Sequence, residues 1–469
     1  MELEEFGRLM LEAMPFEPTD QQIKLAAALT RFCSAYTPQD SVFILNGYAG
    51  TGKTSVMGAL VRSLHYVGIP TVLLASTGRA AKVLSGFTGL PAFTIHRQIY
   101  SSPVMGPDGR FAARLNHNPH VNTVFIVDEA SMIGEESDTS ANSLLHDLVM
   151  YVYSGVNCRL ILLGDTAQLP PVGCDRSPAM DPLKFKELGL RVSRATITKT
   201  VRQQSRSGIL YNATWLRRAM LASPLPEPMI TASPFADIAI VEPEDLEDAL
   251  QTSFSTYGEE QTIIITRSNR RAAEFNRAIR SVVYDREDVL SKGERLVLAK
   301  NNYFWTRGSR EVDFLANGET AVVEEIYSTE LRGAITFADV RLFLPDRQVS
   351  LDAKINLEAL ASESAALPPA ITREVMEQTL AEAGVTGGSV TAQRKALREC
   401  PYYNALQAKY AYAVTCHKAQ GGQWASVFVD MGYIPVEAYG SLDFYRWLYT
   451  AVTRATTRLT FINPAVAIK

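Results

Sequence analysis

The segment from Gly47 to Thr54 reads GYAGTGKT, and it constrains this chain more than any other segment. It matches the pattern GxxxxGK[ST] in full. It lies between an apolar run, SVFILNG at 41–47, and a helix-like stretch that continues to residue 68. A phosphate-binding loop needs that context, because it joins the end of a strand to the start of a helix. The segment therefore predicts a P-loop at the edge of a parallel α/β sheet.

The residue types of this loop suit the binding of Mg·ATP. Glycine tolerates backbone angles that other residues avoid, so the amides along the loop can turn toward phosphate oxygens. The ammonium of Lys53 would meet the outer phosphates, and the hydroxyl of Thr54 would meet Mg²⁺. The nucleotide-binding residues predicted in the loop are Gly47, Ala49, Gly50, Thr51, Gly52, Lys53, Thr54 and Ser55.

Acidic and amide side chains follow two further apolar runs. Asp128 and Glu129 end the run in VFIVDEASM, so Asp128 can hold the water shell of Mg²⁺ and Glu129 can orient an attacking water. Asp128 is thus a predicted metal ligand and Glu129 the predicted catalytic base. Gln168 follows the run that ends at Asp165, and its amide can position a water or contact a γ-phosphate. Asp165 could equally cap a helix.

The chain divides into two α/β halves with two inserts. Its 469 residues exceed what one hydrophobic core usually organises. Strand-like and helical runs alternate, stop, and restart in the second half, whereas short alternating runs between the halves predict a small inserted β-barrel. Asp108 and Gly109 form a strong hairpin signal within the first half. The predicted bounds are 1–195 for the first domain, 100–118 for its hairpin insert, 196–290 with 401–469 for the second domain, and 291–400 for the barrel.

Composition excludes several classes of protein. The five cysteines are widely spaced without a CxxC pair, which argues against a disulfide framework or a zinc site and fits a reducing, cytoplasmic location. No run approaches the roughly 18 apolar residues that span a bilayer, and the acidic start MELEEFGRLM differs from a secretory signal. The net charge of −4 means that any nucleic-acid groove must be local, because there is no global basic field.

The order and spacing of the segments resemble superfamily 1 helicases, in the RecD-like and phage Dda-like branch. The resemblance covers nearly the whole chain and implies two RecA-like domains with ATP between them, a pin in the hairpin insert and an SH3-like barrel insert. Besides the loop and strand-end segments above, the matching motifs are TDQQ at 19–22, ASTGRAAKVL at 75–84, FTIHR at 93–97, TKTVRQQ at 198–204, YAYAVTCHKAQGGQW at 410–424 and YTAVTRAT at 449–456.

The resemblance also implies roles for single residues. Gln22 takes the adenine-reading position, and Arg202 and Arg454 take the positions of two arginine fingers, which would join Lys53, Glu129 and Gln168 as catalytic residues. Gln420 and Gly421 lie in the motif that couples DNA to ATP and are implied to bind nucleotide. The residues implied to contact single-stranded DNA are Thr77, Arg79, Thr94, His96, Phe111, Thr415, His417 and Lys418.

The implied activity is a DNA helicase that hydrolyses Mg·ATP, moves 5′ to 3′ along single-stranded DNA, opens forked duplex DNA and works as a monomer. Two other functions remain open: a translocase that strips proteins from single strands without unwinding, and a P-loop NTPase unrelated to nucleic acid. Arginine candidates in a second α/β domain speak against the unrelated NTPase. A preference for DNA over RNA does not follow from the residues themselves.

Structural alternatives also remain open for single residues. They are a helix cap for TDQQ, buried histidines for His96 and His417, a core position for Trp424, a loop-anchoring aromatic for Phe111 and a surface ion pair for Arg454.

Overall fold

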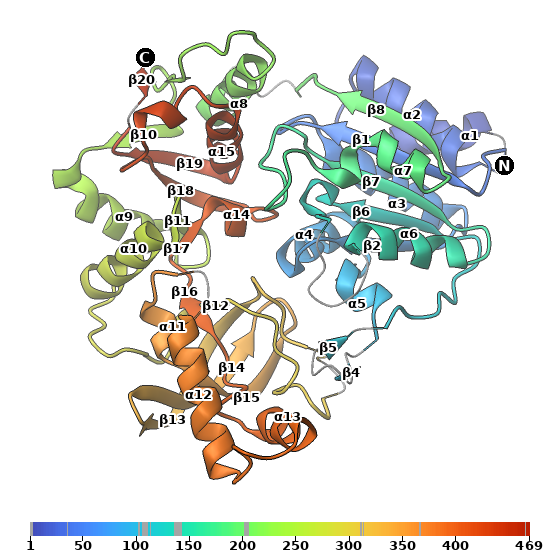
Figure 1. Cartoon of the computed structure of the whole chain (residues 1–469). Helices are drawn as coiled ribbons and strands as arrows, with labels where there is room; N and C mark the ends of the chain where they lie inside the picture. Colours follow the sequence, from blue (N-terminus) through green and yellow to red (C-terminus); the bar gives the residue numbers. More distant parts are fainter. Residues whose placement is uncertain are drawn as a thin grey trace.

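Three parts make up the molecule: an α/β domain at the N-terminal end, a second α/β domain beside it, and a β-rich insert next to the second domain (Figure 1). The computed structural model describes residues 3–34, 36–101, 104–105, 111–112, 114–135, 143–200, 206–309, 312, 314–364, 367–464 and 466–469. In these ranges, no helix combines the length and the apolar character needed to cross a membrane.

The apolar run before the P-loop forms the inner strand β1 of a six-stranded parallel sheet. This strand lies between β7 and β8, with Val42 beside Leu160 and Val192. The inner strands are buried along nearly their whole length, as expected where helices cover both faces of a parallel sheet. In spatial order the strands are β3 (Ala92–Thr94), β2 (Thr71–Ala75), β6 (Val124–Asp128), β7 (Arg159–Gly164), β1 (Ser41–Gly47) and β8 (Arg191–Ile197).

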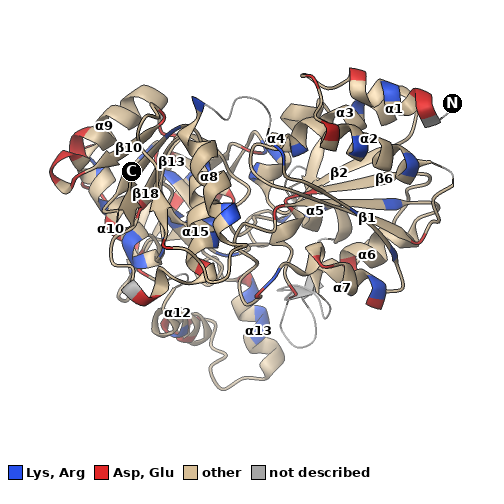
Figure 2. Cartoon of the chain, turned by 90° about the horizontal axis from the view of Figure 1, so that it is seen from above, with Lys and Arg blue, Asp and Glu red and all other residues tan. Residues whose placement is uncertain are grey.

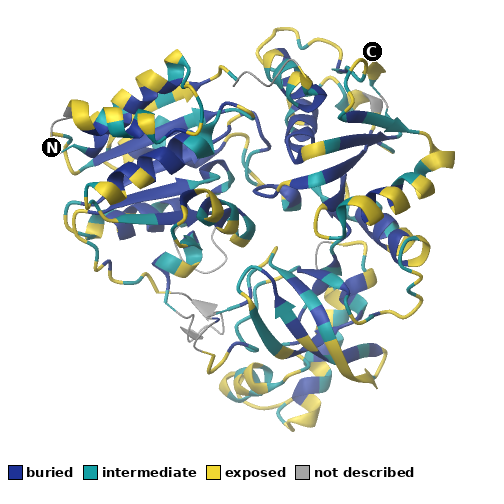
Figure 3. Cartoon of the chain, turned by 180° about the vertical axis from the view of Figure 1, so that it is seen from behind, coloured by how far each residue is buried: buried dark blue, intermediate teal, exposed yellow. Residues whose placement is uncertain are grey.

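Two apolar clusters cover the faces of this first sheet. Leu29 and Leu60 pack on one face, and Leu148 and Phe185 pack on the other. Figure 3 shows the buried strands between helices whose outer faces are exposed. The helices are α1 (Leu3–Glu12), α2 (Asp20–Cys33), α3 (Lys53–Tyr66), α4 (Gly78–Thr88), α5 (Ile95–Ile99), α6 (Leu144–Ser154) and α7 (Pro182–Glu187), with short 3₁₀ turns at Ala130–Met132 and Pro178–Met180.

The second domain repeats this architecture around a five-stranded parallel sheet. In spatial order its strands are β10 (Ile238–Val241), β19 (Ala455–Ile462), β18 (Trp424–Asp430), β11 (Thr262–Thr266) and β17 (Ala413–Thr415). Its helices are α8 (Gly208–Ala219), α9 (Leu246–Tyr257), α10 (Asn269–Val282), α14 (Cys416–Ala419) and α15 (Leu442–Val452). Short strands β9 (Met229–Ile230) and β20 (Ala467–Ile468) pair beside it, and 3₁₀ turns occur at Pro243–Asp245 and Val436–Ala438. The predicted α/β class with two parallel sheets is confirmed.

The insert is an antiparallel five-stranded sheet that curls back on itself. Ile355 bridges Leu406, which joins the end of β15 to the residues before β16 and closes the sheet. In spatial order the strands are β15 (Val349–Asn356), β14 (Ile335–Leu344), β13 (Thr320–Arg332), β12 (Arg295–Leu298) and β16 (Ala408–Tyr410), and the helices are α11 (Glu358–Ala361), α12 (Pro369–Glu382) and α13 (Val390–Glu399). This geometry agrees with a small barrel, and its likeness to SH3 domains stays a prediction.

Two predicted domain boundaries are shifted. The first domain does not end at residue 195, because β8 pairs with β1 as far as Ile197. The insert does not end at residue 400, because Ala408 and Tyr410 of β16 pair with β12 of the barrel. In both cases the edge strand is short or mostly polar, so its sequence pattern resembles a connecting segment.

The predicted hairpin insert is present. Strand β4 (Val104–Met105) pairs antiparallel with β5 (Phe111–Ala112), and Tyr100 bridges Leu115 at the base. The turn predicted at Asp108 and Gly109 lies outside the described residues, as does the side chain of Phe111. The roles of Phe111 as a wedge or an anchor therefore stay predictions.

Candidate nucleotide and nucleic-acid site

The P-loop is a cradle that side chains on its glycines would fill. It connects β1 to α3, and Gly50 and Gly52 adopt φ angles of 71° and 80°, which favour glycine. A Cβ on Gly47 would lie 2.3 Å from Cγ of Lys53, whose ammonium donates a hydrogen bond to the Gly47 carbonyl. Thr54 and Ser55 lie partly exposed in the first turn of α3. The loop amides and the helix start thus form a site suited to phosphate.

Gln22 lies on α2 and supports this loop through a hydrogen bond. Its side-chain amide nitrogen donates to the carbonyl of Thr51 at 3.0 Å, and its amide oxygen accepts from the backbone of Thr19 at 2.9 Å. Thr19 and Gln22 form a reciprocal capping box, so the helix-cap alternative for TDQQ is confirmed. Adenine recognition by Gln22 stays a prediction, and the side chain here supports the P-loop.

Asp128 and Glu129 meet at the carboxyl end of β6 in a strained turn. Glu129 has a φ of 51°, which is uncommon for a residue with a side chain, and its carbonyl accepts from the Ser76 hydroxyl at 2.8 Å. Burial, together with the charge of Glu129, raises the pKa of Asp128 to about 6, while Lys53 opposes that rise. Such a carboxylate pair favours a cation, so it is chemically suited to the predicted Mg²⁺.

Two buried polar atoms near these strand ends lack hydrogen-bond partners. Oε2 of Glu129 and Oε1 of Gln168 have none among the residues that the structure describes. Because buried polar atoms are usually paired, unpaired ones mark places where a water or ligand oxygen belongs. This supports the predicted roles of Glu129 and Gln168 in orienting water.

Asp165 stabilises the turn that carries Gln168. Its Oδ1 accepts from the backbone of Ala167 at 2.9 Å, and the residues directly after Asp165 form a turn rather than a helix, so the helix-cap alternative for Asp165 is wrong. Complete burial raises the pKa of Asp165, and the charge of Lys53 together with a hydrogen bond from Tyr449 counteracts the rise.

The second domain closes directly over the P-loop. The hydroxyl of Tyr449 donates to Oδ2 of Asp165 at 2.7 Å and accepts from the amide of Ala49 at 2.9 Å. A Cβ on Gly50 would lie 2.8 Å from Cδ2 of Leu210 in α8. The site predicted between two domains is therefore bounded by residues of both.

Arg454 is buried beside this interface rather than on the surface. Its side chain is 3% exposed, so the surface ion-pair alternative is wrong. Its Nε donates to the Thr450 carbonyl at 3.0 Å, and its Nη1 and Nη2 donate to the Gly422 carbonyl at 3.2 Å and the Thr453 hydroxyl at 3.1 Å. The finger role of Arg454 stays a prediction, and Arg202 lies outside the described residues.

Two family models match separate parts of the chain. A model described as an AAA domain matches residues 24–222, and a model described as a UvrD-like helicase C-terminal domain matches residues 410–462. Through these two models, the chain is similar to superfamily 1 helicases of the RecD/Pif1 branch. The predicted resemblance to this branch is thus confirmed.

Individual relatives match parts of this chain. The ATP-dependent RecD2 DNA helicase of Deinococcus radiodurans is 33% identical over 36% of this chain and 21% of its own length. The ATP-dependent DNA helicase Pif1 of a Psychrobacter species is 26% identical over 35% of this chain and 25% of its own length. The matches thus span about a fifth to a quarter of these relatives. A Bacteroides Pif1 helicase structure covers 96% of this chain and 92% of that chain at 14% identity, with a TM-score of 0.48.

The first-domain residues that were predicted to contact DNA make other contacts in this structure. The hydroxyls of Thr77 and Thr94 cap α4 and α5. Arg79 stacks on Trp424 with 3.9 Å between its guanidinium carbon and the ring centroid, and donates to the Gln423 carbonyl at 2.9 Å. Burial lowers the pKa of Arg79 to about 10. The nucleic-acid contacts of Thr77, Arg79 and Thr94 stay predictions. In this structure, Arg79 stabilises the interface between the two domains.

The two histidines predicted to contact DNA differ in exposure. His96 is partly buried, with its ring centroid 5.7 Å from that of Tyr100. His417 is exposed, so the buried-histidine alternative is wrong for it, although partial desolvation still lowers its pKa. Trp424 is buried, as its core alternative required.

Gln420 and Gly421 contact the first domain. Gln420 donates to the carbonyl of Leu169 at 2.7 Å, and a Cβ on Gly421 would lie 2.9 Å from the Thr77 hydroxyl oxygen. Their implied nucleotide contacts stay predictions.

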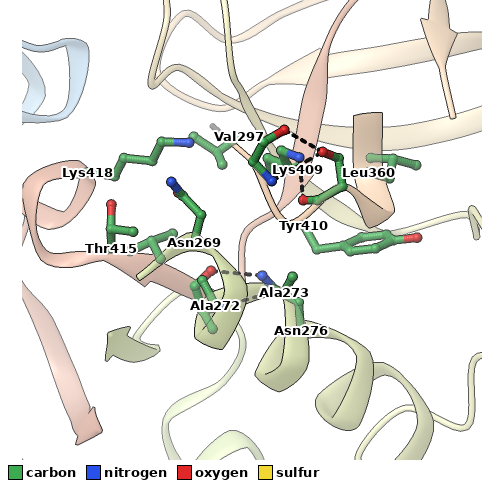
Figure 4. Close-up of a pocket in the computed structure, with 14 residues that line it drawn as sticks. Asn269, Ala272, Ala273, Asn276, Val297, Leu360, Lys409, Tyr410, Thr415 and Lys418 are labelled. Atoms are coloured by element: carbon green, nitrogen blue, oxygen red, sulfur yellow. Dashed lines mark hydrogen bonds between the residues drawn. The ribbon is translucent and has the colours of Figure 1, made fainter. Parts of the chain in front are cut away.

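Sequence reasoning missed a lysine next to the coupling motif. A small cavity of about 20 Å³ lies between the second domain and the barrel, with Asn269, Thr415, Lys409 and Lys418 around it (Figure 4). Lys409 donates to the Ser362 carbonyl at 2.6 Å, and burial with the neighbouring charge of Lys418 lowers its pKa to about 8. The sequence signal that could have found Lys409 is its position directly before Tyr410, where the coupling motif begins. The two lysines form a local basic site, whereas acidic residues gather at the start of α9 (Figure 2).

Proposed function

We propose that this chain is an ATP-dependent DNA translocase and helicase that moves 5′ to 3′ along single-stranded DNA. One observation carries the proposal: Tyr449 of the second domain is hydrogen-bonded to both the P-loop and the turn at Asp165. A nucleotide site built by two domains makes chemistry depend on their closure. Closure and opening can then alternate the grip on a strand that lies across both domains.

The residues of the site divide the chemical work. Lys53 and the loop amides would hold the phosphates of ATP, and Thr54 with Asp128 would hold Mg²⁺, which when bound neutralises phosphate charge. Glu129 orients the attacking water through its buried oxygen that lacks a partner among the described residues. Arg454 and Arg202 are the proposed sources of positive charge from the second half of the chain.

The proposed DNA path runs over the basic site at the second domain and barrel. Thr415, His417 and Lys418 are offered by α14 and the residue before it, and Lys409 lies beside them. Phosphates would bind there through local charge, because the chain as a whole is acidic. The matched relatives carry the name DNA helicase, which favours DNA as the partner.

The proposed form is a cytoplasmic monomer. One chain supplies both sides of the nucleotide site through Ala49 and Tyr449, so a second copy is not needed to complete it. The five cysteines are free, as expected in a reducing compartment. Sedimentation of the protein with and without single-stranded DNA tests the monomer.

The decisive experiment measures ATP hydrolysis with and without single-stranded DNA. We expect a slow basal rate and strong stimulation, with His417→Ala and Lys418→Ala reducing the stimulation more than the basal rate. Lys186→Ala, which changes an exposed lysine on α7, is the control. A rate that does not respond to saturating DNA contradicts the motor. Unwinding of a forked duplex then separates a helicase from a translocase that does not open duplex.

A further inference from the structure

Tyr449 connects the two domains through a single buried hydroxyl. The side chain is 1% exposed and lies on α15 of the second domain. Its oxygen accepts from the Ala49 amide in the P-loop, and its proton is donated to the Asp165 carboxylate at the end of β7. Ala49 and Asp165 come from different loops of the first domain, so this hydroxyl holds both loops against the second domain.

The bridge lies beside the groups that would carry the chemistry. Asp165 also accepts from the backbone of Ala167, in the turn that presents Gln168, and Lys53 is near enough to lower its pKa. A buried carboxylate that loses a hydrogen-bond donor is costly to leave unsatisfied, and bonds to charged groups are stronger than neutral ones. The bridge is therefore a strong link among the polar contacts between the domains.

The same helix leads to Arg454. Thr450 accepts from the backbone of Leu169 through its hydroxyl at 2.8 Å, and its carbonyl accepts from the Arg454 guanidinium at 3.0 Å. Tyr449 and Thr450 hold the end of α15 against the first domain. The position of Arg454 relative to the P-loop therefore depends on their contacts.

We propose that Tyr449 is a positioning residue for ATP hydrolysis: its hydroxyl fixes the end of α15, and with it Arg454, against the P-loop and the turn that carries Gln168. This inference rests on the proposed function. It assigns Tyr449 no contact with the reacting atoms. Its effect falls on the geometry reached when the domains close, so it changes turnover more than ATP binding.

The test compares Tyr449→Phe with Tyr445→Phe. Tyr445 lies one turn earlier on α15 and is also buried, but its hydroxyl donates to the Pro226 carbonyl within the second domain. With saturating ATP and single-stranded DNA, we expect Tyr449→Phe to lower kcat at least about tenfold while KM for ATP changes less than about threefold. Tyr445→Phe should stay within about twofold of the natural protein in both constants.

A second variant approaches the bridge from the other domain. Asp165→Asn keeps the shape but removes the charge that Tyr449 faces. If both residues act through the bridge, the double variant should lose no more turnover than the worse single variant. Melting temperatures show that each variant is folded, and if Tyr449→Phe is unfolded, Asp165→Asn decides alone.

Three outcomes would overturn the inference: equal turnover in Tyr449→Phe and Tyr445→Phe, a loss confined to KM, or additive losses in the double variant. If Tyr449→Phe is unfolded, normal turnover in Asp165→Asn would overturn the inference. If single-stranded DNA does not change the rate of ATP hydrolysis by the natural protein, the proposed function is contradicted instead. Failure of the proposed function is therefore distinguishable from failure of the inference about Tyr449.

Discussion

The side-chain amide of Gln420 donates a 2.7 Å hydrogen bond to the carbonyl oxygen of Leu169, the residue that follows Gln168 in the first domain. Gln420 is 7% exposed and closely follows His417 and Lys418 in sequence. The bond therefore joins the predicted DNA contacts of the second domain to the turn near the predicted γ-phosphate position. It offers a direct route by which DNA binding can change hydrolysis.

Gln420→Ala is expected to weaken the coupling between DNA and hydrolysis. The variant leaves the buried Leu169 carbonyl without its donor, so DNA-stimulated hydrolysis should fall more than basal hydrolysis, with the stimulation ratio lowered at least about fivefold. Gln423→Ala is the matched control, because its side chain is exposed in the same motif. An unchanged stimulation ratio in steady-state ATPase assays would remove Gln420 from the route.

Lys53→Ala should abolish hydrolysis and weaken ATP binding. Backbone amides nearby cannot replace an ammonium that faces the outer phosphates. Steady-state rates below about a tenth of the natural value are expected, a loss of more than about 1.4 kcal/mol of transition-state stabilisation. The exposed Lys24→Ala in α2 serves as control and should keep full activity. Retention of activity in Lys53→Ala would show that the P-loop assignment is wrong.

Glu129→Gln should bind ATP and fail to turn it over. The amide keeps the shape of the side chain and removes the base, so kcat should fall at least about 100-fold while the Kd for ATP changes less than about threefold. Equilibrium binding and single-turnover hydrolysis check the two parts. Glu135→Gln, which alters an exposed carboxylate paired with Lys184, should be neutral. Lost ATP affinity in Glu129→Gln would argue for a structural role.

Arg454→Ala should lower both turnover and stability. As an arginine finger its loss should reduce kcat by about 10³-fold, and the loss of three buried hydrogen bonds should also lower Tm. Rates are therefore measured well below the Tm of each variant. Arg458→Ala, which removes a more exposed arginine bonded to the Ala236 carbonyl, is the control. A folded Arg454→Ala protein with near-normal kcat would leave only the structural role.

Lys409 should make DNA affinity depend on pH. Its pKa is lowered from 10.5 to about 8, so the ammonium loses its proton as the pH rises through about 8, and a phosphate contact weakens. Between pH 7 and 9 the Kd of the natural protein for single-stranded DNA should rise at least about threefold more than that of Lys409→Met. Lys409→Arg stays charged, so its Kd for single-stranded DNA should depend less on pH than that of the natural protein. Equal pH slopes in all three would place Lys409 off the DNA path.

Local sequence determined the parts of this protein whose conformation depends on near neighbours. The P-loop follows from glycines at backbone angles that favour them, and the buried parallel strands follow from continuous apolar runs that helices cover on both faces. The hairpin and the position of Asp128 and Glu129 at a strand end follow in the same way. Because these features arise within a few residues, the motif positions could be read along the chain.

Tertiary structure alone decided the edges of the domains and the use of several side chains. The largely polar strand β8 and the short strand β16 carry no clear apolar pattern, and only pairing with β1 and β12 places them in their sheets. Arg79 faces Trp424, and Tyr449 bridges Ala49 and Asp165, across hundreds of residues. Such partners depend on how two folded domains pack, and a hydrogen bond between domains leaves no periodic trace in either sequence segment.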